Sequence, residues 1–280
     1  MSAAPATLGR GRRPSLAGPL WKRAMLPAYV VLVLLLTLAP ILVILVYSLN
    51  QAPNNRISFS WQGFTTEWYR RLFEIPDLTS ALVTSLEIAA LSTVIAVAIG
   101  TPAAMALARY RFRGRGTGDL VILADIAAPS VVVGASLLGL FVYLGLSRGF
   151  GTILLAHVAF NVAFVVIVLQ ARLRDIDPAL SEAARDLGSS PFQAFWLVTV
   201  PVIYPAILAA SLLAAALSID DFIITSFDAG QTLTFPLWVY GSVKVGIPPQ
   251  VFAMGTLIFA VGVLIAIAGL VMARRSKPQA

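Results

Sequence analysis

The chain has 280 residues, of which 59% are hydrophobic and only 12% are charged, whereas about a quarter of the residues in a soluble domain are charged. This composition excludes an ordinary water-soluble protein and indicates a small polytopic membrane protein. The net charge is +7, cysteine is absent and His157 is the single histidine. A disulfide framework, a thiolate metal site and a multi-histidine metal site are therefore excluded, and we expect no metal site.

Six apolar stretches are long enough to cross a hydrocarbon core about 30 Å thick. They predict an all-α polytopic membrane protein with six transmembrane helices, over residues 26–49, 79–107, 120–146, 152–171, 203–227 and 251–273. The first stretch is too long for the apolar region of a signal peptide, so we expect a retained helix. Residues 1–25 and 274–280 are predicted to be cytoplasmic tails, and the low complexity of the first predicts disorder.

The lysine and arginine residues predict the orientation, because loops rich in these residues stay on the cytoplasmic side. With both termini inside, the outer loops hold only five of the twenty basic residues: Arg56, Arg70, Arg71, Arg148 and Lys244. The positive charge therefore reflects N-in, C-in topology and contact with anionic lipid headgroups. We expect membrane lipid, and no nucleic acid, as a partner.

Two connecting segments are too long for simple turns. In the outer segment 50–78, the aromatic residues and Leu72 of the stretch 67–73 recur at i, i+3 and i+4 spacing, which predicts a short amphipathic helix on the outer surface. In the inner segment 172–200, Asp177-Pro178 supplies a helix start and Gly188 a left-handed stop. Ser190-Pro191-Phe192-Gln193 then forms a capping box, so this segment is predicted to be a compact helix, turn and helix, with Pro201 preceding the next span.

The inner segment also resembles the EAA loop of binding-protein-dependent ABC importer permeases. The matching pattern is Glu182-Ala183-Ala184, then Gly188 after three residues, then Val198-x-Val200-Pro201, where the family commonly has Ile-x-Leu-Pro. The resemblance implies the type I importer permease architecture, in which this loop is a coupling helix that docks into a groove of a cytoplasmic ATPase subunit. It assigns that role here to Glu182, Ala183, Ala184, Gly188 and Pro201.

Further motifs, in order along the chain, resemble the second permease subunit of the spermidine and putrescine branch. They are Trp61-Gln62-Gly63-Phe64, Trp68-Tyr69, Arg109-Tyr110-Arg111-Phe112-Arg113-Gly114, Ser218-Ile219-Asp220-Asp221, Phe235-Pro236, Tyr240, Val243-Lys244-Val245-Gly246 and Pro248. The resemblance implies polyamine import in a bacterial inner membrane. It also implies two ATPase subunits, a second permease subunit, most simply in a heterodimer, and an extracytoplasmic substrate-binding protein as partners.

The chain has no phosphate-binding loop of its own. That loop requires a lysine after a glycine, and none of Lys22, Lys244 and Lys277 follows a glycine. We therefore expect neither a catalytic residue nor a bound cofactor in this chain. ATP and Mg²⁺ are expected on the partner ATPase subunits.

Four acidic residues lie within the predicted spans: Glu87, Asp125, Asp220 and Asp221. A charge at the bilayer centre costs about 2.5–3.5 kcal/mol on insertion scales, so such residues are seldom without a role. Glu87, Asp220 and Asp221 fall in the outer halves of their spans, where a cation arriving from outside would enter.

Our hypothesis is that these carboxylates balance the charge of a polyamine, while Phe222, Trp238 and Tyr240 offer aromatic faces for cation–π contact. The alternative is that the acids cap helices or bond to neighbouring helices. His157 and Asn161 are four residues apart and share one helix face, which favours hydrogen bonds between helices.

Two other functions stay open at this point. The same class of importer could carry another organic cation, an amino-phosphonate or iron. A secondary transporter that uses the four intramembrane acids as proton relays is disfavoured, because a proton-driven carrier does not need the EAA loop.

Overall fold

The computed structural model describes residues 20–275. The predicted cytoplasmic tails lie outside the described residues, except for their inner ends, which belong to the terminal helices. The described elements are α1 (Leu20–Tyr47), α2 (Glu67–Arg70), α3 (Pro76–Arg109), α4 (Arg115–Ala127), α5 (Ser130–Tyr143), α6 (Phe150–Arg174), α7 (Ala179–Asp186), α8 (Pro191–Ala194), the π-helical turn η1 (Phe195–Thr199), α9 (Val200–Asp220), α10 (Ile223–Asp228), α11 (Phe235–Ser242) and α12 (Pro249–Arg275). Within residues 20–275 the only β pairing is a bridge between Asn50 and Phe64, which confirms the all-α class.

Within residues 20–275, five helices are long and apolar enough to cross a membrane, and a bent pair makes a sixth candidate. The stretch 120–146, predicted as one span, is instead α4 and α5, which meet at 111°. Pro129 explains the break, because proline has no N–H to donate and disfavours helical backbone at the residue before it. Ala128 is accordingly extended, with ψ at 135°.

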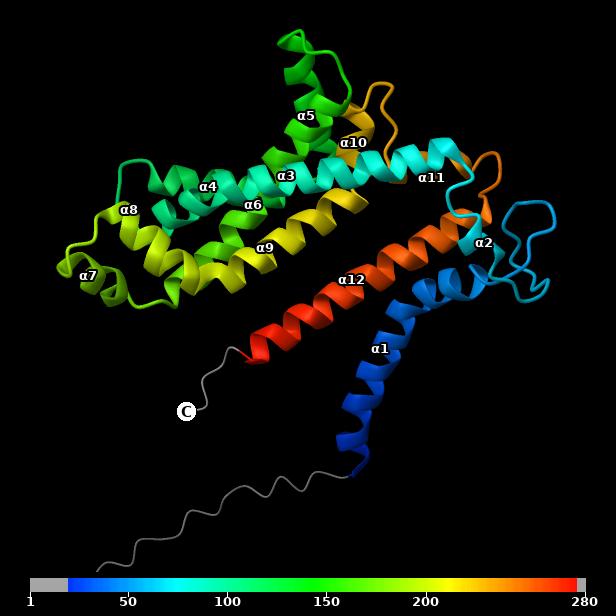
Figure 1. Cartoon of the computed structure of the whole chain (residues 1–280), viewed down its shortest axis with the longest axis horizontal. Helices are drawn as coiled ribbons and strands as arrows, with labels where there is room; N and C mark the ends of the chain where they lie inside the picture. The colour runs from blue at the N-terminus through cyan, green and yellow to red at the C-terminus, as the bar shows by residue number, and fades with distance from the viewer. Residues whose placement is uncertain (1–19, 276–280) are drawn as a thin grey trace, which may run out of the picture.

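The centre of the molecule is a bundle in which α3, α6 and α9 run side by side, with α4 against α6 (Figure 1). Leu169 and Leu173 of α6 and Ile203 of α9 are fully buried in this core. A Cβ on Gly100 of α3 would lie 2.7 Å from Val165 of α6, so the glycine permits their close contact. Burial of each large apolar side chain contributes about 1.5–3 kcal/mol.

Two helix pairs flank this bundle. The terminal helices α1 and α12 contact each other at the end near α2 and diverge away from it (Figure 1). Elsewhere α5 leaves the bundle together with the short helix α10. A Cβ on Gly134 of α5 would lie 2.8 Å from Phe227 and 3.2 Å from Ile224 of α10, so this glycine allows the two helices to touch.

The loops gather at opposite ends of the bundle, with α7 and α8 at one end and α2 and α11 at the other (Figure 1). At the second end, Trp68 of α2 is buried and donates its indole N–H to the carbonyl oxygen of Asn50 at 2.8 Å. The amphipathic helix predicted for residues 67–73 is shorter than expected, because α2 ends at Arg70. Helix α11 was not predicted, although Pro236 in its first turn is a helix-start signal.

The fifth span differs from its prediction at both ends. It was predicted over 203–227, but helix runs without a break from Pro191 through η1 to Asp220, and α10 is separate. Pro201 does not precede the helix but lies inside it. A π-helical turn lies just before Pro201 and is closed by the bond from Val200 N–H to the Phe195 carbonyl oxygen. It changes the hydrogen-bond pattern of the helix next to a proline, which has no N–H to donate.

Candidate EAA loop and cation site

The EAA loop, residues 172–200, has the local geometry that its sequence predicts. The carboxylate of Asp177 accepts the Ala179 N–H at 2.9 Å at the start of α7. At its end Gly188 has φ of +92°, its N–H donates to the Arg185 carbonyl oxygen at 2.9 Å, and the Ser189 N–H donates to the Ala184 carbonyl oxygen at 3.1 Å. These two bonds form a Schellman cap, which requires a left-handed residue.

The same loop presents exposed side chains at its end of the molecule. Glu182 and Ala183 are exposed and Ala184 is half-buried. Leu180 and Leu187 expose 51% and 89% of their surface. Apolar side chains gathered on a polar end are typical of a protein-binding surface.

A second candidate site lies where α9 ends. A cavity of about 600 Å³, here called the Asp220 cavity, opens between α9, α11 and α12. Exposed Asp220 lines it together with Phe222 and Tyr240, whose ring centroids are 4.7 Å apart. The negative end of the α9 dipole adds to the carboxylate charge, so this cavity combines an anionic group with two aromatic faces, the features that suit a cation.

The structure separates the other predicted pathway residues from this cavity. Trp238 lines a smaller neighbouring cavity of about 350 Å³ and packs against the core around α2 and α12. Glu87 is exposed on α3 and Asp125 is half-buried on α4, and neither lines the Asp220 cavity. Three of the six predicted pathway residues therefore meet in one place: Asp220, Phe222 and Tyr240.

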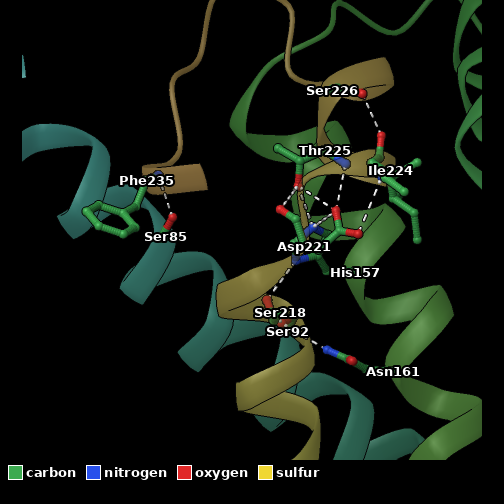
Figure 2. Close-up of polar contacts among 11 residues, drawn as sticks. Ser85, Ser92, His157, Asn161, Ser218, Asp221, Ile224, Thr225, Ser226 and Phe235 are labelled. Atoms are coloured by element: carbon green, nitrogen blue, oxygen red, sulfur yellow. Dashed lines mark hydrogen bonds and ion pairs between the residues drawn. The ribbon is translucent and has the colours of Figure 1, made fainter. Parts of the chain in front are cut away.

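Asp221 does not line the Asp220 cavity, and its side chain lies in a buried polar network (Figure 2). Its carboxylate accepts the N–H groups of Ile224 at 3.4 Å and Thr225 at 2.8 Å, and so caps α10. It also lies 3.5 Å from the His157 ring. Capping and bonding to another helix were the alternative roles considered for these acids.

The predicted bonds between helices are confirmed for His157 and Asn161. His157 of α6 bonds to Ser218 of α9 at 2.7 Å and to Thr225 of α10 at 2.9 Å. Asn161 donates to Ser92 of α3 at 3.4 Å. The sequence could not identify Ser92, Ser218 and Thr225 as members of this network, because single hydroxyl residues in apolar helices carry no pattern.

A second large cavity offers no charged group to a ligand. A cavity of about 660 Å³ between α3 and the η1–α9 segment is lined by residues such as Met105, Trp196 and Tyr204, and by no ionisable carboxylate or amine. Among the described residues, no group of three or more His, Asp or Glu side chains is placed to hold a metal ion.

Comparison with known proteins identifies the family. Residues 96–277 match the family described as "Binding-protein-dependent transport system inner membrane component". The putrescine transport system permease protein PotI of Escherichia coli strain K12 is 41% identical over 228 residues, which cover 79% of this chain and 80% of PotI. The spermidine/putrescine transport system permease protein PotC of the same strain is 35% identical, covering 84% of this chain and 88% of PotC.

Solved structures share the fold. A chain of a bacterial ABC transporter involved in the import of alginate matches with a TM-score of 0.64 and 19% identity, over 95% of this chain and all of that chain. The alginate ABC transporter in complex with a periplasmic protein gives a TM-score of 0.65 with 17% identity, over 91% of this chain and 94% of that chain. The resemblance seen in the sequence is thereby confirmed, and the chain belongs to the family of binding-protein-dependent transport system inner membrane components.

Proposed function

We propose that this chain is a transmembrane permease subunit of an ATP-driven importer of polyamines. The similarity to permeases named for putrescine and spermidine, over about four fifths of the chain, supports the substrate class. The Asp220 cavity supports it independently, because its chemistry suits an organic cation.

Polyamines carry two or more ammonium groups on an aliphatic chain. In the Asp220 cavity the carboxylate would pair with one ammonium group, with a strong charge-assisted hydrogen bond, and Phe222 and Tyr240 would flank the cation. The cavity volume of about 600 Å³ falls within the range of about 300–1,000 Å³ typical of small-molecule sites.

The observation that carries the proposal is a single helical path between the two candidate sites. Helix is continuous over the 30 residues from Pro191, in the EAA loop, to Asp220, in the cavity. At 1.5 Å per residue this path is about 45 Å long. Movement of the EAA loop would therefore be transmitted to the cavity along one continuous helix, which is the form of coupling that alternating access needs.

The proposed partners come from the resemblance to importer permeases, and the exposed surfaces offer places for them. Two ATPase subunits, which carry ATP and Mg²⁺, would bind the EAA loops around Glu182, one loop from each permease subunit. A second permease subunit, in a heterodimer, would close the open side of the Asp220 cavity, where Tyr240 is 60% exposed. The substrate-binding protein would deliver the polyamine at the end that carries α2 and α11. Glu87, Trp238 and Asp221 stay predictions for parts of the same path.

Replacement of Asp220 by Asn tests the substrate proposal. The maximal rate of ATP-driven polyamine uptake is the relevant quantity, because affinity in such an assay is set mainly by the binding protein. Loss of a hydrogen bond to a charged group costs about 1.5–3 kcal/mol, so we expect a fall of about tenfold or more. The matched control is Asp220→Glu, which keeps the charge and should retain most of the rate. An unchanged rate in Asp220→Asn, at normal expression, would refute the assigned site.

A further inference from the structure

Helix α9 ends at the Asp220 cavity, and the non-helical backbone between α9 and α10 needs support. Inside a bilayer, irregular backbone is tolerated only where protein or a water-filled cavity satisfies its polar groups. Here Asp221 is extended, with φ of −65° and ψ of 119°. Asp220 consequently lines the cavity while the next side chain, Asp221, faces the polar network (Figure 2).

With His157 as a neutral imidazole, the hydrogen bonds of the network have one direction. Thr225 Oγ1 donates to the Asp221 carboxylate at 2.9 Å, so its hydrogen is not available to His157. Thr225 Oγ1 must therefore accept from His157 Nε2, at 2.9 Å. A neutral imidazole has one donor and one acceptor, so Nδ1 accepts from Ser218 Oγ at 2.7 Å. The His157 tautomer is assigned by this chain of hydrogen bonds.

The series of hydrogen bonds continues on the Nδ1 side of the His157 ring. Because Ser218 donates to His157, it accepts from Ser92 Oγ at 3.2 Å, and Ser92 in turn accepts from Asn161 at 3.4 Å. The order of donation is thus from Asn161 through Ser92, Ser218, His157 and Thr225 to Asp221. It joins α6, α3, α9 and α10 in one buried path, and His157, only 3% exposed, is its centre.

We propose that His157 is a positioning residue for the cation site. Its two bonds fix the last turn of α9, through Ser218, against α10, through Thr225. The angle at the break is thereby held so that Asp220 and Phe222 remain in the cavity beside Tyr240. This inference rests on the proposed function for its effect on transport, but its structural part can be tested separately.

The structural test measures the distance across the cavity by cross-linking. The chain has no cysteine, so Phe222→Cys with Tyr240→Cys provides a unique thiol pair for a short bifunctional thiol reagent, read as the linked peptides by mass spectrometry. In the complete complex, His157→Phe should slow cross-linking about fivefold or more, because the ring then offers neither donor nor acceptor. His157→Gln, which carries both, should stay within about twofold of the parent.

Two further variants separate positioning from general stability. Leu169→Ala also opens a cavity in the buried face of α6, but it lies in the bundle core away from α10; it should leave cross-linking unchanged. Thr225→Val keeps the shape of the side chain and removes the hydroxyl that bonds both His157 Nε2 and Asp221; it should act like His157→Phe. Equal cross-linking in His157→Phe and the parent, or equal slowing by Leu169→Ala, would overturn the proposal.

The transport test uses a double-mutant cycle on the maximal uptake rate of spermidine. If His157 acts through Asp220, His157→Phe should lower the rate strongly in the parent and by less than about twofold in Asp220→Asn, because residues that act as a unit are not additive. Additive losses would contradict positioning. A parent complex that imports no polyamine would refute the proposed function, while the cross-linking result would still decide the role of His157.

Discussion

Replacement of Gly188 by valine tests whether the shape of the EAA loop transmits ATP hydrolysis to the membrane helices. Gly188 has φ of +92°, and a Cβ added there would meet nothing within 4 Å. The whole cost of the substitution is therefore backbone strain, about 1–2 kcal/mol for a residue that is not glycine in this region. That cost lowers the ratio of loops with a closed Schellman cap to loops with an open one by about 5–30-fold.

The chain contains a matched control for this strain. Gly145, at the end of α5, has φ of +69° and no atom within 4 Å of an added Cβ. The bonds from Gly145 N–H to Val142 and from Leu146 N–H to Phe141 give it the same Schellman pattern. Gly145→Val therefore introduces the same kind of strain at a place outside the EAA loop.

The assay is uptake per ATP hydrolysed in proteoliposomes that contain the complete transporter. We expect Gly188→Val to reduce this ratio about fivefold or more and Gly145→Val to change it less than about twofold. Gly188→Asn should be intermediate, because asparagine tolerates left-handed backbone. Parental coupling in Gly188→Val, or an equal loss in Gly145→Val, would refute the assignment of the loop.

Three shorter predictions address the cavity and the core. Tyr240→Ala should lower the maximal polyamine uptake rate about 2–30-fold, from a cation–π contribution of about 0.5–2 kcal/mol, and Tyr240→Phe should retain it; equal losses would contradict a role for the ring. Leu169→Ala should destabilise the purified protein by about 2–5 kcal/mol, seen as a lower midpoint of thermal unfolding, and an unchanged midpoint would contradict the assigned core. Trp68→Phe, which removes the bond to Asn50, should destabilise the outer loop by about 1 kcal/mol, seen as faster local hydrogen exchange.

The helical class, the positions of most spans and the caps of α7 and α8 were predictable because each depends on local chemistry. Apolar length determines a span, and the signals at Asp177, Gly188 and Ser190 act within a few residues of their positions. The break at Pro129 was visible as a proline, but its 111° bend depends on how α5 packs on α10 through Gly134. That contact joins segments about 90 residues apart in the chain, and neither segment has a periodic sequence pattern that would predict it.

The sequence predicted which types of residue form the cation site, but only some of the named residues lie there. Asp220, Phe222 and Tyr240 share one cavity, whereas Asp221, adjacent to Asp220, faces His157. The two carboxylates diverge because helix ends at Asp220 and the backbone of Asp221 is extended. The sequence predicted one continuous helix over 203–227, which cannot show that the two side chains diverge. The wrong helix end and the grouping of Asp221 with Asp220 therefore have the same cause.

We propose that this chain couples ATP hydrolysis, through the EAA loop, to polyamine import. The most direct measurement is ATP-dependent uptake of labelled spermidine and putrescine by proteoliposomes that contain the chain with its ATPase, second permease subunit and loaded binding protein. We predict uptake that persists when the proton gradient is collapsed and disappears in Glu182→Lys. An assembly with active, binding-protein-stimulated ATPase that imports neither polyamine, or that imports them equally well with Glu182→Lys, would contradict the account.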